Sequence, residues 1–505
     1  MLKTFLKHEI LNLLKSRRIY ITVAMFLLLF VSVFIVRVID FQKQMNQYLA
    51  DVQQADEILQ NPPNYSHINP RAIHQPLIFS IYNQGFSFDR VISIQVYEAI
   101  DTSIAQNEER NSVNFEDNQL DITYLITFFL SLFILLISYD SVNGEKRTGT
   151  LRILLTYPIK RQSFVLKKIL GVFVFVAITF TIPYVLSIMS LVFIYANLLT
   201  SSFFLSAFFY WFLVMLFIFF FCLLGIFLSV CTTNPNRSLV YSLLTWIMLC
   251  IILPTSWDYI VSPKLYNDEI VQLQRLHADK QREAQGMLQG QDLSGIYLSN
   301  NGGITRNVMI LSNLETYQKW YRYLEHLYEN YFPANREIEL AMDSIIRKRI
   351  SMENIRSLVF FFNPIVLFND ISNRIAGNSR ADYHRFLQEG RGMRNDFVSI
   401  GIREGWLLGY GFFAQKADET LLGSEEYWNE RFRTNYDSAL NDMIAIVSNA
   451  EMFSFEMPII RRYEQPNPTF GEIFNRIAVV LAMFVVSILG LWILTWTKFM
   501  RYDVR

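Results

Sequence analysis

Six long runs of apolar residues, none of them containing Asp, Glu, Lys, Arg or His, constrain this chain more than any other feature. They cover residues 19–36, 122–139, 169–195, 203–230, 239–257 and 477–497. The hydrocarbon core of a bilayer is about 30 Å thick, and a helix of roughly 17–25 residues crosses it. Each run meets that length, so we expect an α-helical polytopic membrane protein with six transmembrane helices. A soluble globule, a disordered chain and a fibre are excluded.

Basic residues in the short segments predict the orientation of these helices. Lys and Arg are concentrated in 1–18, 140–168, 231–238 and the tail 498–505, which lie on one side of the membrane if all six runs cross it. The positive-inside rule assigns that side to the cytoplasm. We therefore expect a multi-pass protein of a bacterial inner membrane with both termini in the cytoplasm. The segments 37–121 and 258–476 then lie outside. A net charge of zero gives no reason to expect nucleic acid as a partner.

The segments that flank the runs carry weaker signals. Residues 2–14 place apolar side chains at helical spacing opposite lysines, which is typical of an amphipathic helix lying on the membrane surface. A plain extension of the first span is the alternative. The outer segment 37–121 contains Pro62-Pro63, which breaks any helix there, and we expect short strands or loops around 78–81 and 91–96.

The outer segment 258–476 is long enough for a core of its own and is predicted to be mainly helical. Apolar residues from Leu314 to Tyr331 recur in steps of three and four, so they share one helix face. Pro333 is expected to interrupt that helix, and a second helical pattern follows it through Ile346.

Enzymatic motifs are missing from the sequence. The chain contains no G-x-x-x-x-G-K-[ST], no H-E-x-x-H and no G-x-S-x-G. Its six histidines are dispersed, and its three cysteines lie in or beside the apolar runs, so neither a metal site nor a disulfide framework is expected. We therefore expect no catalytic residue, no metal and no cofactor on this chain, and we do not expect an enzyme.

The absence of charge within the runs argues against ion-coupled transport, which usually needs ionisable groups in the membrane. The third run is the most polar of the six. Its candidate pathway-lining residues are Thr179, Thr181, Tyr184 and Ser187. Hydrogen bonds between helices are the alternative role for these side chains.

The stretch between the second and third runs carries the most informative motif. It reads E-x-x-x-G-T-L and then L-L-x-x-P-[IV]-x-R, with glycines, an apolar centre and basic ends. This pattern resembles permeases of the second type of ATP-binding-cassette exporters, in which the corresponding stretch holds the coupling helix that docks on the ATPase. The resemblance assigns ATPase coupling to Glu145, Gly149, Thr150, Leu151, Leu154, Leu155, Pro158 and Arg161.

The same resemblance implies the partners. ATP and Mg²⁺ would bind to a separate cytoplasmic ATPase dimer, and a second permease, identical or related, would complete the pathway in contact with membrane lipids. The stretches 363–368 and 375–378 look like family members with a long insertion before the last span. The sequence thus predicts the permease subunit of an exporter. The alternative is a mechanotransmission subunit that drives a periplasmic partner protein without moving cargo.

Overall fold

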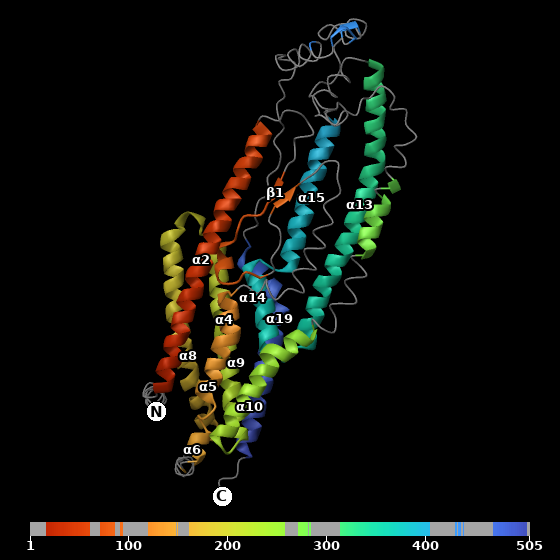
Figure 1. Cartoon of the computed structure of the whole chain (residues 1–505). Coiled ribbons are helices and arrows are strands. Elements are labelled where there is room, and N and C mark those ends of the chain that lie inside the picture. Colours follow the sequence, from red (N-terminus) through yellow and green to blue (C-terminus); the bar gives the residue numbers. More distant parts are fainter. Residues whose placement is uncertain are drawn as a thin grey trace.

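The structure is a computed structural model of the whole chain. It describes residues 17–60, 71–85, 91–93, 120–147, 149, 161–257, 271–280, 282–283, 314–403, 430–431, 433–435, 438 and 468–501. Figure 1 shows a bundle of long helices and, continuing from one end of it, a second group of helices. The start of the first described helix and the end of the last one both lie toward the opposite end of the bundle (Figure 1).

Within the described residues, six helices are long and apolar enough to cross a membrane. They are Ile19–Glu57, Ile122–Arg147, Phe164–Ile194, Ser201–Cys231, Pro235–Trp257 and Phe470–Met500. Each overlaps one of the six predicted runs, so the prediction of a helical membrane protein with six spans is confirmed.

The first span is part of a much longer helix, α2 (Arg17–Gln60), which has 44 residues. It continues well past the apolar run because Phe41 and Met45 stay buried against the bundle while the opposite face turns polar. At a rise of 1.5 Å per residue the helix is about 66 Å long, roughly twice the thickness of the hydrocarbon core. The segment that begins at residue 37 therefore starts as helix.

The second span combines α4 (Ile122–Leu125), the π-helical turn η4 (Ile126–Leu130) and α5 (Ser131–Ser138). The fifth span joins α10 (Pro235–Ile247) to a second π-helical turn, η6 (Met248–Ile252). The two spans meet at these turns, where the indole nitrogen of Trp246 donates to Ser131 Oγ at 2.9 Å. A π turn frees backbone groups of a helix for other partners.

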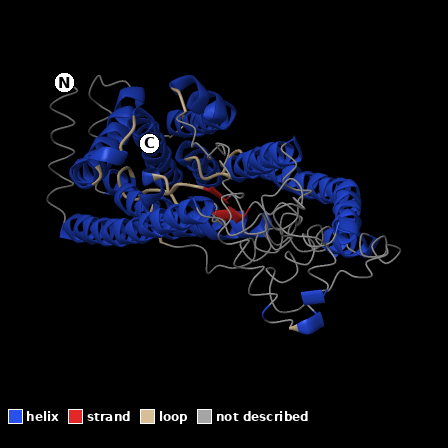
Figure 2. Ribbon diagram, turned by 90° about the horizontal axis from the view of Figure 1, so that it is seen from above, coloured by secondary structure: helices blue, strands red, loops and turns tan. Residues whose placement is uncertain are grey.

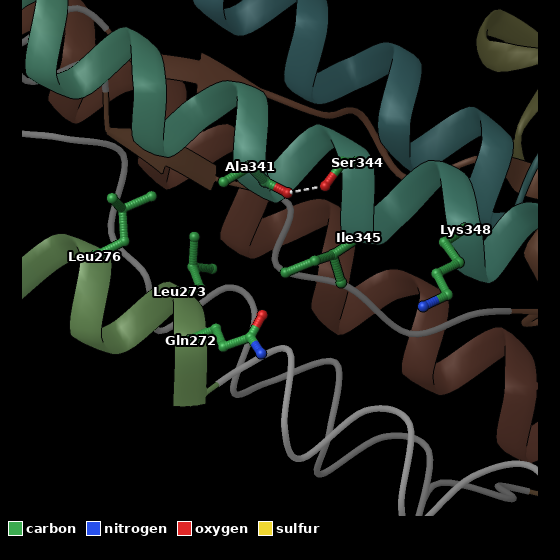
Figure 3. Close-up of a pocket in the computed structure, with 7 residues that line it drawn as sticks. All are labelled: Gln272, Leu273, Leu276, Ala341, Ser344, Ile345 and Lys348. Carbon is green, nitrogen blue, oxygen red and sulfur yellow. Dashed lines mark hydrogen bonds between the residues drawn. The ribbon is translucent and has the colours of Figure 1, made fainter.

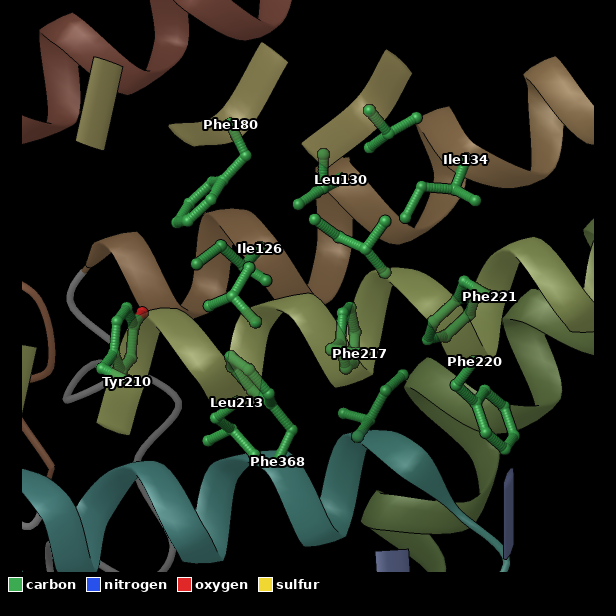
Figure 4. Close-up of a cluster of buried hydrophobic side chains, with 14 of the residues drawn as sticks. Ile126, Leu130, Ile134, Phe180, Tyr210, Leu213, Phe217, Phe220, Phe221 and Phe368 are labelled. Atoms are coloured by element: carbon green, nitrogen blue, oxygen red, sulfur yellow. The ribbon is translucent and has the colours of Figure 1, made fainter. Parts of the chain in front are cut away.

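The fourth span, α9 (Ser201–Cys231), is the central helix of the bundle. It is apolar on every face, as expected for a helix surrounded by others. It packs against α5, against α8 (Arg161–Ile194) and against α19 (Phe470–Met500). Figure 4 shows Phe217 and Leu213 of α9 between side chains of α4–α5 and Phe368. By contrast, α2, α10 and α19 expose long apolar faces, which suits contact with membrane lipids.

Two short segments enter the bundle without crossing it. The segment η2 (Ile78–Ile81) is a 3-10 helix that is fully buried beside α2 and α9, so the expected strand or loop at 78–81 is wrong. The helix α14 (Pro364–Ala376) begins at Asn363, whose side chain accepts from Ile365 N, and it packs against α9 and α19. Parts of both long segments, 37–121 and 258–476, are thus anchored inside the bundle.

The remaining described part has its own small core. Its main elements are α13 (Leu314–Val359) and α15 (Arg380–Arg403), and a helix at 271–280 packs beside them. Ile338, Met342 and Phe386 are among the residues buried between them. The strands β1 (Arg71–Ile73) and β2 (Val91–Ser93) pair antiparallel, with β1 against α15. Figure 2 shows how far helix dominates the described chain.

One expectation for this part was wrong. The backbone of α13 stays helical through position 333, although Pro333 was expected to end a helix. Proline removes one backbone hydrogen bond and crowds the preceding turn, but regular helix on both sides can absorb that cost. The side chains of the predicted stripe from Leu314 to Tyr331 and the surface helix at 2–14 lie outside what the structure describes.

Candidate functional site

Polar side chains gather at the two ends of the bundle. At one end lies α6 (Asn143–Arg147), close to where α19 ends (Figure 1). We call this the α6 end. At the other end the bundle meets α13 and α15, and we call this the α15 end.

At the α6 end, hydrogen bonds fasten α6 to the last turn of α9. The backbone nitrogens of Val142 and Asn143 donate to Ser229 Oγ at 3.2 and 3.1 Å. The Asn143 amide donates to Thr232 Oγ1 at 2.6 Å. Lys146 Nζ donates to the carbonyl oxygens of Val230 and Thr232 at 2.7 and 3.1 Å. A lysine ammonium on the final carbonyls satisfies acceptors that a helix end leaves open.

An ion pair then joins α6 to the third span. Glu145 Oε1 lies 2.6 Å from Lys168 Nζ, and the Lys168 side chain is only 6% exposed. The Lys168 ammonium also lies 5.9 Å from the ring centre of Phe164, which stacks on Phe499 of α19 at 5.9 Å. The α6 segment is therefore tied to the ends of α8 and α9, and α8 is tied to α19.

The predicted ATPase-coupling residues divide into three groups. Glu145 pairs with Lys168 within the chain, as described above. Gly149 has a φ of +74°, a conformation that favours glycine, and no described heavy atom lies within 4 Å of the position that a Cβ would take. Arg161 is the first residue of α8. The other five, Thr150, Leu151, Leu154, Leu155 and Pro158, lie outside the described residues.

The four candidate pathway-lining residues all make hydrogen bonds within the protein. Tyr184 OH donates to Ala207 O at 2.9 Å, and Ser187 Oγ lies 2.8 Å from Tyr82 OH. Thr181 Oγ1 accepts from the indole of Trp211 at 3.1 Å. Thr179 donates to the carbonyl of Phe175 in its own helix at 2.9 Å. Three of the four thus connect α8 to other segments.

At the α15 end, the entering segments η2 and α14 bind one another and the second span. The Asn83 amide nitrogen donates to Ser372 Oγ at 2.6 Å and to Asn373 Oδ1 at 2.9 Å. Thr123 Oγ1 lies 3.0 Å from Tyr210 OH and 3.3 Å from Ser372 Oγ. Nearly every member of this cluster is buried, so its hydrogen bonds specify how these helices meet.

Asp121 fixes the start of the second span. Its carboxylate accepts from Tyr124 N at 2.6 Å, as a helix N-cap, and from Gln84 N at 3.1 Å. Burial raises the pKa of Asp121 to about 6, although these two backbone donors and the charge of Arg37 pull it back. Arg37 is itself buried on α2, and it donates to Ser80 O at 3.3 Å.

A close backbone approach completes this cluster. Gly85 has a φ of +63°, and a Cβ there would lie 2.6 Å from both Cβ and O of Asn378. The Asn378 amide in turn donates to Asn83 O at 3.2 Å. Glycine suits position 85 because it adopts a positive φ without strain and has no Cβ to collide with Asn378.

The contacts of five residues were not predictable from the sequence: those of Lys168, Ser229 and Thr232 at the α6 end, and those of Asn83 and Ser372 at the α15 end. Lys168 stands in the predicted basic loop, where the sequence shows it only as one more positive charge. Asn83 and Ser372 are 289 positions apart, and no local pattern relates them. Polar residues within otherwise apolar stretches, as at Asn83-Gln84 and Asn369-Asp370, were the available signal.

Neither a metal centre nor a clear ligand cavity stands out in the described part of the chain. No group of three or more His, Cys, Asp or Glu that could hold a metal ion occurs there. A shallow groove of about 540 Å³ separates the helix at 271–280 from α13 (Figure 3). It is lined by Gln272, Leu273, Leu276, Ala341, Ser344, Ile345 and Lys348.

Comparison with known proteins gives a family over the full length and relatives over a short stretch. The family described as "ABC-2 family transporter protein" matches residues 4–504. The probable ABC transporter permease protein NosY of Pseudomonas aeruginosa is 48% identical over 50 residues, which are 10% of this chain and 18% of that protein. The protein of the same name from Stutzerimonas stutzeri is 47% identical over 47 residues, 9% of this chain and 17% of its own length.

Proposed function

The chain belongs to the ABC-2 family of transporter proteins, and from that premise we propose that it is the permease subunit of an exporter driven by a separate ATPase. The ATPase supplies ATP and Mg²⁺ binding, and this chain contributes the membrane path. Two relatives support this role. Both are named as a probable ABC transporter permease, and each is similar to this chain over a short stretch. The α6 end faces the cytoplasm in this proposal, as the basic loops predict.

The anchoring of α6 is the observation that carries the proposal. The stretch 148–160, which bears the family motif, leaves the end of α6 and enters α8. The contacts of Lys146, Asn143 and Glu145 bind α6 to α9 and to α8. A push or pull applied by an ATPase to 148–160 therefore acts on two spans at once.

Mechanotransmission is the second candidate, and two observations favour it. The predicted lining residues Thr181, Tyr184 and Ser187 bond to neighbouring segments, which suits helices that move as connected bodies. In addition, α2 and the 46-residue α13 extend beyond the bundle toward its α15 end. Such helices can deliver motion to a periplasmic partner protein. In both versions two permeases, identical or related, act with an ATPase dimer.

The test is reconstitution of the chain with an ABC ATPase from its own host cell. We expect the unaltered chain to co-purify with the ATPase and to change its rate of ATP hydrolysis. Glu145→Gln removes the carboxylate from the α6–α8 ion pair, so the complex should form while the effect of the permease on hydrolysis is lost. Glu283→Gln, which removes one exposed carboxylate far from α6, is the matched control.

Two results would overturn the proposal. The first is an unaltered chain that binds no ABC ATPase. The second is a Glu145→Gln complex that regulates hydrolysis just as the Glu283→Gln complex does. Substrate-dependent hydrolysis in lipid vesicles would favour export, and dependence on an added periplasmic protein would favour mechanotransmission.

A further inference from the structure

Arg374 of α14 makes contacts with three helices at the α15 end. Its guanidinium binds Asp370 of the same helix at 2.8 and 3.2 Å. It donates to Asn354 Oδ1 of α13 at 2.7 Å and to the carbonyl of Arg476 in α19 at 3.1 Å. Asp370 accepts in turn from Ser357 Oγ of α13 at 2.7 Å. The planar fork of arginine suits this role, because it directs several donors at once.

A second contact brings α15 into the same group. Arg476 Nη1 lies 3.3 Å from Asp382 Oδ1 in the first turn of α15. Asp382 also accepts from the backbone nitrogen and hydroxyl of Ser379, so its carboxylate is fixed at the start of that helix. Arg380 of α15 then pairs with Glu353 of α13. The four helices α13, α14, α15 and α19 are thus joined by one connected set of ion pairs and hydrogen bonds.

The far end of α19 is held at the α6 end. Phe499 stacks on Phe164, which lies beside the Lys168–Glu145 ion pair. From Arg476 to Phe499 the helix rises about 35 Å, enough to cross the hydrocarbon core. A single α-helix therefore connects the segment tied to α6 with the group of charges around Arg374.

We infer that α19 carries ATPase-driven motion across the membrane, that Arg374 is the positioning residue that passes this motion to α13, and that Arg476 passes it to α15. This inference rests on the proposed function and names the element that delivers its motion. Without Arg374, α14 keeps its apolar face on α9 and α19 through Phe368, Ile371 and Ile375. The bundle should therefore assemble, while α13 loses its bond to the arginine that also holds α19.

The experiment measures a distance in the complex with the ATPase, in lipid nanodiscs. Labels are placed at Gln388→Cys on α15 and at Asn197→Cys in the turn between α8 and α9 (η5, Ala196–Leu198), both of which are exposed. The background has Cys222, Cys231 and Cys250 replaced by Ala, and labelled chains are diluted with unlabelled ones. The distance is compared between the nucleotide-free complex and the complex trapped with ADP, Mg²⁺ and vanadate.

We expect the trapped state to shift this distance in the unaltered chain and in the control Arg385→Ala. Arg385 contacts Asp382 at 3.6 Å but does not join α14 to α13, so it removes an arginine nearby without cutting the link. In the double variant Arg374→Ala/Arg476→Ala, which removes the links of α19 to both α13 and α15, the shift should disappear while ATP hydrolysis continues. If the double variant does not assemble, Arg374→Ala and Arg476→Ala take its place singly, and each should reduce the shift because each leaves only the other link.

An unchanged shift in the altered complex would overturn the inference, and so would the absence of any shift in the unaltered complex that hydrolyses ATP. Failure of the unaltered chain to bind the ATPase would instead overturn the proposed function. The two failures are therefore distinguishable.

Discussion

The packing of α9 against α5 makes a sharp prediction at Gly225. A Cβ added there would overlap Ser138 Oγ and would lie 2.8 Å from Ser138 Cβ. Carbon atoms in normal contact are about 3.5–4.0 Å apart. Rotation of the Ser138 hydroxyl relieves only the first contact, so the two helices must separate. Overpacking of this kind costs about 1–3 kcal/mol. The better helix propensity of alanine returns roughly 0.5–1 kcal/mol of that.

We therefore expect Gly225→Ala to lower the free energy of unfolding by about 0.5–2 kcal/mol, measured by SDS titration in mixed micelles. Gly490→Ala in α19 is the matched control, because no described atom lies within 4 Å of its added Cβ. That variant should be as stable as the original or slightly more stable. Ser138→Gly removes both obstructing atoms. The double variant Ser138→Gly/Gly225→Ala should therefore be more stable, by at least about 1 kcal/mol, than the sum of the two single effects predicts.

The reasoning is refuted if Gly225→Ala is as stable as Gly490→Ala. It is also refuted if the double variant shows no recovery, because the loss of stability would then have a source other than the contact with Ser138.

Two further predictions concern pH and orientation. The pKa of Asp121 is raised from 3.8 to about 6, so the folded protein holds the Asp121 proton more tightly than the unfolded chain does. The contribution of this proton to stability is therefore present at low pH and is lost as the pH rises through that window. The stability of the chain relative to Asp121→Asn, which cannot titrate, should fall by up to about 3 kcal/mol between pH 4 and pH 7; a difference independent of pH would contradict the assignment. In a Cys231→Ser background, Ser344→Cys on α13 should react with an impermeant thiol reagent in intact spheroplasts, and Asn236→Cys in the first turn of α10 should not. Reaction in the opposite sense would reverse the orientation.

The six spans were predictable because length and hydropathy alone decide them. The extent of α2 was not, because the apolar run ends at Val36 while the helix is continued by side chains such as Phe41 that find partners elsewhere in the chain. The continuity of α13 at Pro333 was also not predictable, because a local rule for proline set the expectation while the helix continues on both sides of it.

The candidate sites were predictable only where the motif is contiguous. The sequence marked 140–168 as a distinct segment, and the family resemblance assigned ATPase coupling to Glu145, which stays a prediction. The ion pair of Glu145 with Lys168, 23 positions away, was not predictable. That pairing depends on how α6 folds back on α8, which no periodicity encodes. The contacts of Asn83 with Ser372 and of Arg374 with Asn354 likewise require the entry of η2 and α14 into the bundle.

We propose that an ATPase acts on this membrane protein at its α6 end. The most direct test is site-specific photo-crosslinking in cells, with a photoreactive amino acid at Arg147, which is exposed on α6, and the same substitution at Ser344 on α13. We expect a crosslink to an ABC ATPase from position 147 and none from position 344. A crosslink to the ATPase from position 344, or none from position 147 in cells that contain the assembled complex, would contradict the account.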